Sequence, residues 1–311
     1  MMKEHILKNN KKINILCVGN YRKDKFLKII NKIAIFFENK SKFNIYLSND
    51  FKKNNKETKV SKNVIVGEYK KLIKIADIVF SIGGDGTILS TVKNMRIKQI
   101  PILGIHIGNL GFLTQCTEDN LTESLKKIES SKFIIEKRIL LCLKIDNSKK
   151  YYALNDIVVD HGNSGRILKT KLSIKTSNND KYIHLNNFES DGVIISTPTG
   201  STGYSLSSGG PIIYPDLDLF NVTPISSHSL SARPIVFSSK NIFKIEFFEN
   251  FIDASITIDG QTRINLNKNN IIYIEKAKYS AKLIAFSSNS YISALKNKLG
   301  WSGNFSNNTP N

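Results

Sequence analysis

Apolar residues in the first half of the chain alternate between short continuous runs and helical spacing. The runs predict buried strands, whereas the spacing of Phe26, Ile29, Ile30, Ile33 and Phe37 predicts an amphipathic helix. Strands that alternate with helices are typical of a parallel sheet with crossover connections. The expected strands cover residues 13–19, 43–47, 75–82 and 101–107, the expected helices cover 23–38, 88–95 and 118–128, and a polar loop covers 49–63.

From about residue 132 the pattern changes to short β-rich runs separated by polar turns. Two of these runs, 133–145 and 151–159, flank a polar turn at 146–150 and predict a hairpin. Further strands are expected at 167–176, 192–196, 235–248, 254–258, 271–275 and 281–286, followed by a helix at 290–299 and a polar tail from Ser302 that we expect to fray.

These patterns predict two domains and a closing segment. Residues 1–131 are expected to form an α/β N-terminal domain with a mainly parallel sheet, and residues 132–286 a mostly β C-terminal domain. Residues 287–311 form the closing segment. A hydrophobic content of 41% in 311 residues is enough to build cores of this size, so a wholly disordered chain is excluded.

Charge raises the question of nucleic-acid binding, because the formal net charge is +19. Residues 1–75 contain 18 Lys and one Arg against six acids, so +13 of the excess lies in the first quarter. Nucleic-acid sites favour Arg for phosphates and interleaved aromatic residues for stacking, whereas here Lys is scattered among Asn, Ile and Phe. The pattern favours solvated lysines over a specific nucleic-acid site.

Cysteine and hydropathy patterns bear on the compartment. Cys17, Cys116 and Cys142 are far apart and include no CxxC, so neither a disulfide framework nor a thiolate zinc site is indicated. None of the five histidines stands at metal-ligand spacing, so no protein-held metal is expected. No apolar run approaches the ~18 residues of a membrane span. We expect a cytoplasmic protein without a membrane partner.

The sharpest local motif is Gly83-Gly84-Asp85-Gly86-Thr87, between an expected strand and an expected helix. Glycines let the backbone approach a phosphate closely, and the start of the helix presents N–H groups to an anion. Asp85 then lies where a carboxylate could accept a proton from a hydroxyl. The chain contains no Gly-Lys dipeptide, which excludes a Walker A loop, and Leu89 stands where a dinucleotide fingerprint needs its third glycine.

Two further segments offer polar groups to a nucleotide. The hydroxyl- and glycine-rich loop at 197–211 follows an expected strand, and its prolines, together with Tyr204 and Leu206, which we expect to be buried, indicate a fixed shape. It contains no G-x-S-x-G elbow, so a nucleophilic serine is not indicated. Asn155-Asp156 offers an amide and a carboxylate to base edges or ribose hydroxyls, although such pairs are also common in turns.

Taken together, these motifs resemble those of the bacterial NAD kinase family. The resemblance extends from the first strand to Leu299-Gly300-Trp301, and the loop at 197–211 makes it specific, since lipid kinases and 6-phosphofructokinases share only the first motif. The matching segments, in order, are 83–87, 104–113, 155–158, 190–211, 229–234 and 259–261.

The resemblance implies phosphorylation of the adenosine ribose 2′-hydroxyl of NAD by ATP, assisted by a divalent metal cation such as Mg²⁺. It implies Asp85 as proton acceptor beside Gly86, and Asn155 and Asp156 as contacts of ribose and adenine groups. The family more often has Glu at the position of Asp156. The other nucleotide-binding positions that it implies are Arg166, Asp191, Thr199, Thr202, Gly203, Tyr204, Ser205, Leu206, Ser207 and Gln261.

The resemblance also implies a closing segment that returns to the N-terminal domain and a homo-oligomer, dimer or tetramer, in which a neighbouring subunit often completes the site. Two alternatives stand beside this interpretation. A lipid kinase with the same Gly-Asp-Gly loop would need an apolar groove or a membrane-facing surface, and a basic nucleic-acid-binding protein would tolerate substitution of Asp85. Conversion of NAD and ATP to NADP distinguishes them.

Overall fold

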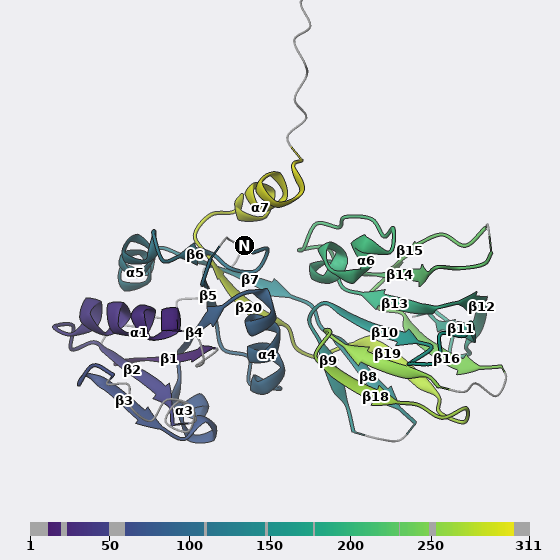
Figure 1. Ribbon diagram of the computed structural model, residues 1–311, viewed down its shortest axis with the longest axis horizontal. Coiled ribbons are helices and arrows are strands. Elements are labelled where there is room, and N and C mark those ends of the chain that lie inside the picture. The colour runs from purple at the N-terminus through teal and green to yellow at the C-terminus, as the bar shows by residue number, and fades with distance from the viewer. Residues whose placement is uncertain are drawn as a thin grey trace, which may run out of the picture. The chain divides into compact units, whose positions relative to one another are not determined.

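The computed structural model describes the chain at residues 12–19, 24–49, 60–108, 111–146, 149–176, 178–229, 231–248 and 253–301. The chain divides into two compact units, one made of residues 1–91, 100–136 and 282–311 and the other of residues 92–99 and 137–281 (Figure 1). The division falls within three elements, the helix α4 (Asp85–Met95) and the strands β7 (Ile134–Arg138) and β20 (Ala281–Ala285).

The first unit is an α/β layer built on an eight-stranded sheet in the order β3-β2-β1-β4-β5-β20-β7, with β6 beside β5. Every pairing of β1 to β6 is parallel, as is that of β5 with β20. The remaining elements are β1 (Ile13–Gly19), α1 (Asp24–Phe37), β2 (Phe43–Ser48), β3 (Val64–Gly67), α3 (Tyr69–Ile75), β4 (Ile78–Gly83), β5 (Ile102–His106), β6 (Cys116–Thr117), α5 (Leu121–Glu129) and α7 (Ser290–Leu299).

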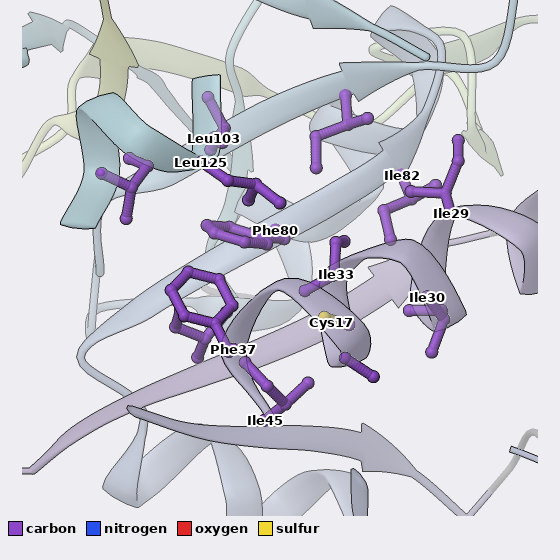
Figure 2. Close-up of a cluster of buried hydrophobic side chains, with 14 of the residues drawn as sticks. Cys17, Ile29, Ile30, Ile33, Phe37, Ile45, Phe80, Ile82, Leu103 and Leu125 are labelled. Carbon is purple, nitrogen blue, oxygen red and sulfur yellow. The ribbon is translucent and has the colours of Figure 1, made fainter. Parts of the chain in front are cut away.

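The core of this unit forms where one face of α1 packs on the sheet. Ile29, Ile33 and Phe37 of the helix lie against Cys17 of β1 and Phe80 of β4 in one buried cluster (Figure 2). These helical residues have the spacing that the sequence pattern singled out. Burial raises the pKa of the Cys17 thiol far above its usual value, so this cysteine is an inert part of the core.

The second unit consists of two six-stranded sheets in which neighbouring strands pair antiparallel, in the orders β15-β14-β13-β10-β17-β18 and β12-β11-β16-β19-β8-β9. Apolar residues of both sheets form one core. Its elements are β8 (Leu141–Ile145), β9 (Tyr151–Ala153), β10 (Asp156–Asp160), β11 (Leu168–Lys175), β12 (Ile183–Ser190), β13 (Gly192–Ser196), η1 (Thr199–Thr202), α6 (Tyr204–Ser207), β14 (Leu219–Ile225), β15 (Ile235–Ser238), β16 (Ile242–Phe247), β17 (Ser255–Ile258), β18 (Thr262–Asn265) and β19 (Ile272–Lys276).

The predicted hairpin at 133–159 is correct only in its centre. β8 and β9 do pair, with Leu141 opposite Ala153, but the run at 133–145 divides into β7 and β8, which belong to different sheets. The run at 151–159 divides in the same way into β9 and β10. The second break has a clear cause, because the N–H groups of Leu154, Asn155 and Asp156 bond to a carboxylate instead of to a neighbouring strand.

Other differences concern elements with weak periodicity. Strands β3, β6, β12, β14 and β18 and helices α3, η1 and α6 were not predicted, and Ile75 ends α3 instead of beginning a strand. The predicted strand at 235–248 is two strands, β15 and β16, joined by a turn. Most of the expected 49–63 loop, residues 109 and 110, and the tail from Ser302 lie outside the described residues.

Candidate functional site

The motif at 83–87 forms the predicted strand-turn-helix junction. β4 ends at Gly83, and α4 begins at Asp85. A Cβ at Gly83 would overlap the Thr87 side chain, so glycine is required for this turn to close onto the helix. By contrast, Gly86 is exposed, and a Cβ there would meet nothing within 4 Å. The start of α4 is therefore open beside Gly86, at a helix end whose dipole favours an anion.

The Asp85 carboxylate is fixed by the segment that follows β5. Phe112 N–H donates to Oδ2 at 2.8 Å, and Leu113 N–H donates to Oδ1 at 3.1 Å. One N–H bond to each oxygen sets the plane of the carboxylate and leaves a lone pair on each oxygen. Such a group is oriented before any substrate arrives, which is what a proton acceptor needs.

Gly111 gives a direct test of this orientation. A Cβ at Gly111 would overlap the Asp85 carboxylate, so Gly111→Ala must displace that group. We expect kcat to fall about 100-fold, because small misplacements of a reacting group have effects of this size. The matched control is Gly67→Ala, whose Cβ would meet only the flexible Leu72 side chain at 3.1 Å. Steady-state kinetics of both variants decide the matter, and a fully active Gly111→Ala would contradict a need for this orientation.

In the second unit, the side chains of β10 alternate between the core and a pocket. Ile157 and Val159 face the core, whereas Asp156, Val158 and Asp160 face the other side of the sheet, as strand alternation requires. A pocket of about 300 Å³ opens on that side. It is lined by Asn155, Asp156, Val158, Asp160, Tyr204, Thr257, Asp259 and Gly260.

Asp259 fixes the backbone of residues 154–156, which forms one wall of this pocket. It lies in the hairpin between β17 and β18, where Asp259 and Gly260 both have positive φ, of 50° and 63°. The Asp259 carboxylate accepts N–H bonds from Leu154 at 2.9 Å, Asn155 at 2.7 Å and Asp156 at 3.2 Å. This residue was not among the predicted site residues. An Asp-Gly pair after a β-rich run is a turn signal, but its long-range partners leave no trace in the sequence.

Two acids therefore lie buried together. Burial, and after it the charge of Asp259, raises the pKa of Asp156 to about 7. Burial also raises the pKa of Asp259, although three N–H bonds and the charge of Lys93 act in the opposite direction. Within the part of the chain that the structure describes, the Asp156 carboxyl has no hydrogen-bond partner. It is 5% exposed and is available to a ligand in the pocket.

The loop at 197–211 lies directly on Asn155 and Asp156, so the structure brings these two predicted segments together. Thr197 N–H donates to the Asn155 carbonyl at 2.9 Å, and a Cβ at Gly200 would overlap that carbonyl. A Cβ at Gly203 would lie 3.5 Å from Asn155 Nδ2. The loop is held in one shape, as expected. Thr199 and Thr202 lie in η1, and Ser205, Leu206 and Ser207 lie in α6.

Tyr204 corrects one expectation. The residue is 48% exposed, not buried, because it begins α6 at the pocket, while Ser205 takes the buried position. Ser205 Oγ contacts Thr223 Oγ1 at 3.1 Å and accepts from Asn221 Nδ2 at 2.9 Å. Asn221 is fully buried and was also missed, because β14 itself was not predicted.

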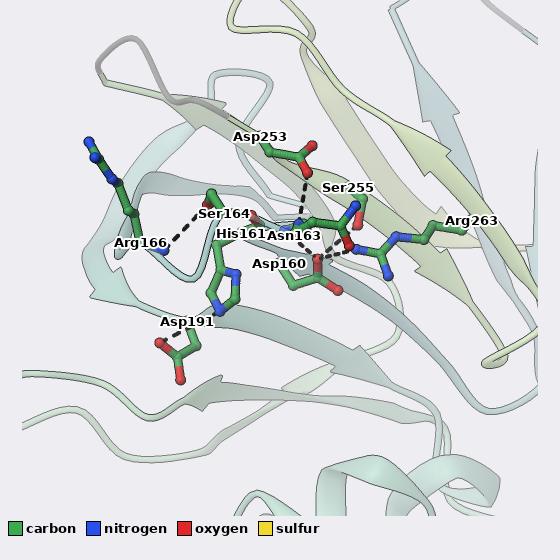
Figure 3. A network of polar contacts seen from close by, with 10 residues as sticks. Asp160, His161, Asn163, Ser164, Arg166, Asp191, Asp253, Ser255 and Arg263 are labelled. Carbon is green, nitrogen blue, oxygen red and sulfur yellow. Dashed lines mark hydrogen bonds and ion pairs between the residues drawn. The ribbon is translucent and has the colours of Figure 1, made fainter.

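Two of the other predicted positions, Arg166 and Asp191, belong to a polar network that also includes Asp160 (Figure 3). Asp191 Oδ1 lies 3.9 Å from His161 Nε2. The Arg166 side chain is exposed and points away from this network, and its backbone N–H donates to Ser164 Oγ at 3.3 Å. Gln261 is exposed in the β17–β18 hairpin. Neither Arg166 nor Gln261 lines the pocket.

Known proteins match both units. The family described as ATP-NAD kinase N-terminal domain matches residues 15–133, and the ATP-NAD kinase C-terminal domain matches residues 154–286. NAD kinase of Clostridium perfringens (strain 13 / Type A) is 38% identical over 289 residues, which are 92% of this chain and 98% of the relative. NAD kinase of Clostridium botulinum (strain Kyoto / Type A2) is 40% identical over 228 residues, 72% of this chain and 79% of the relative.

Two solved structures share the fold. Yeast NADH kinase complexed with NADH superposes with a TM-score of 0.81 at 24% identity, covering 96% of this chain and 90% of the yeast chain. NAD kinase from Archaeoglobus fulgidus in complex with ATP superposes with a TM-score of 0.68 at 24% identity, covering 93% and 98%. Both show a two-domain architecture like that described above.

Proposed function

The chain belongs to the ATP-NAD kinase family and phosphorylates NAD, and we propose that Asp85 accepts the proton of the adenosine ribose 2′-hydroxyl as ATP donates the phosphoryl group. The observation that carries this role is the carboxylate orientation by Phe112 and Leu113 at the start of α4. The 2′-oxygen forms a bond to the γ-phosphorus, the bond from that phosphorus to the β-phosphate oxygen breaks, and ADP leaves. The hydroxyl proton passes to Asp85.

Phosphoryl transfer depends mainly on positioning and on neutralising charge, and a divalent metal ion would contribute to that neutralisation. Within the described ranges, no group of three or more His, Cys, Asp or Glu side chains could hold a metal ion. The proposal leaves coordination of a divalent cation such as Mg²⁺ to the ATP phosphates and assigns only the proton to Asp85.

We propose that the pocket of the second unit binds NAD. Its walls combine the Asn155 amide with carboxyl groups of Asp156 and Asp160, which suits ribose hydroxyls and the amino group of adenine. Asn155 Oδ1 is buried without a partner among the described residues, as expected of a group that waits for a ligand donor. Thr199, Thr202 and Ser207 belong to the loop that lies against this wall.

Loss of polar groups at this wall should weaken NAD binding. We expect Asn155→Ala and Thr202→Val each to raise the Kd for NAD about tenfold, since the first removes an amide that lines the pocket and the second a hydroxyl of the loop that lies against Asn155. Titration calorimetry with NAD measures the affinity, and formation of NADP by the unaltered chain establishes activity. Asn94→Ala, at an exposed position of α4, is the control. Unchanged affinity in both site variants would contradict the assignment of the pocket.

We also propose that the protein is a homo-oligomer, dimer or tetramer, in the cytoplasm. The strand β15 ends one sheet and leaves Ile235 and Val236 42% and 45% exposed, which is typical of an edge that another chain covers. Among the described residues, no helix is long and apolar enough to cross a membrane.

A further inference from the structure

Lys93 stands in the last turn of α4, in the part of that helix that belongs to the second unit. Its Nζ donates to Thr262 Oγ1 at 3.3 Å. Thr262 is the first residue of β18 and therefore follows directly on the hairpin that contains Asp259 and Gly260. The Lys93 side chain is thus hydrogen-bonded to the β17–β18 hairpin, whose Asp259 carboxylate accepts the N–H bonds of the pocket wall.

Because other acids lie near Asp259, a cation such as Lys93 beside the hairpin favours the ionised form of its carboxyl. Two further acids, Asp156 and Asp160 of β10, line the same pocket as Asp259. Tyr204 of α6 lines it as well. Arg263 of β18 faces Asp160, with Nη2 3.6 Å from Oδ1. The charge of Lys93 opposes the burial that raises the pKa of Asp259, with a smaller effect than the three N–H bonds to this carboxyl. An ionised Asp259 accepts the three N–H bonds more strongly than a neutral one.

We propose that Lys93 is a positioning residue for NAD, which holds the Asp259 hairpin through its charge and its bond to Thr262 and thereby fixes the backbone of Asn155 and Asp156. Lys93 does not line the pocket and acts only through the hairpin that contains Asp259. The inference rests on the proposed binding of NAD in this pocket. It gives α4 two roles, because the same helix begins at Asp85.

The test is Lys93→Met, with Lys93→Arg as the variant that restores the charge. We expect Lys93→Met to raise the KM for NAD about fivefold near neutral pH, with kcat within about twofold of the unaltered enzyme. Without the cation, Asp259 binds a proton at higher pH. The ratio of the KM of Lys93→Met to that of the unaltered enzyme should therefore grow as the pH falls, and Lys93→Arg should abolish that growth.

Two further variants separate charge from structure. Thr262→Val removes the hydroxyl but keeps the charge of Lys93, so its KM should rise by about twofold or less, without the pH-dependent growth. Lys126→Met, at an exposed position of α5, should behave as the unaltered enzyme. An unchanged KM in Lys93→Met, or a rise that is the same at every pH, overturns the proposal. An unaltered chain that forms no NADP overturns the proposed function instead.

Discussion

Asp85→Asn should lower kcat by roughly 10²- to 10⁴-fold, the usual contribution of a positioned proton acceptor, while the Kd for NAD stays within about threefold. An amide cannot take the hydroxyl proton. It also places an NH₂ donor against the N–H group of Phe112 or Leu113, so the loop after β5 is disturbed as well. Rapid-quench measurement of NADP formation gives the rate of the chemical step, and calorimetry gives the affinity.

The control for this change is Asp119→Asn, which makes the same substitution at an exposed position of the first unit. It should leave kcat and the melting temperature unaltered. Thermal unfolding of Asp85→Asn shows how much of the loss comes from the loop, because displaced N–H bonds lower the melting temperature whereas the loss of a proton acceptor does not. Near-normal turnover in Asp85→Asn would refute the assigned role.

The first unit could be predicted well because each element has its own strong pattern. The bounds predicted for β1 and α7 agree with those in the structure. The face of α1 that carries Ile29, Ile33 and Phe37 has a clear helical period. Failures occur where the period is short or broken. β3 has four residues with only Val64 buried, so its pattern does not stand out from a loop.

The candidate site could be predicted only as separate pieces. Glycine spacing marks the turn before Asp85, and hydroxyl content marks the loop at 197–211. Contacts between distant segments cannot be found in this way. The Asp259 carboxylate lies 104 positions from Asn155 along the chain, and only the folded structure shows that it holds this wall. Tyr204 was misjudged for a related reason, because an aromatic residue in an ordered loop can equally line a pocket.

Folding also changes how the basic composition is understood. Lys32 of α1 and Lys40, which follows that helix, pair with Glu118 and Glu129, with N–O distances of 2.8 and 2.6 Å. Part of the lysine excess in the first quarter therefore meets acids that come later in the sequence. Exposed pairs of this kind add little to stability, but they show that these lysines form ion pairs on the surface of the α/β unit.

Asp156→Asn should make the free protein more stable above neutral pH and should weaken NAD binding. Burial raises the pKa of Asp156 to about 7 in the folded state, against 3.8 as its ordinary value. The folded state therefore binds the proton more tightly than the unfolded state, and the associated stability is lost as the pH rises through about 7. Asparagine is neutral at every pH, so the variant should gain about 2–4 kcal/mol at pH 8 and little near pH 4.

The same substitution should raise the Kd for NAD about tenfold or more, because the ionised carboxyl would accept hydroxyl donors of the ligand. For the change in stability, Asp160→Asn is the matched control on the same strand. Its carboxylate already accepts from Ser255 Oγ at 2.7 Å and Gly162 N–H at 2.8 Å, so this variant should lose about 1 kcal/mol. Denaturant unfolding between pH 5 and pH 8 compares both variants. If Asp156→Asn were no more stable at pH 8, Asp156 would not be an unpartnered buried acid held for a ligand.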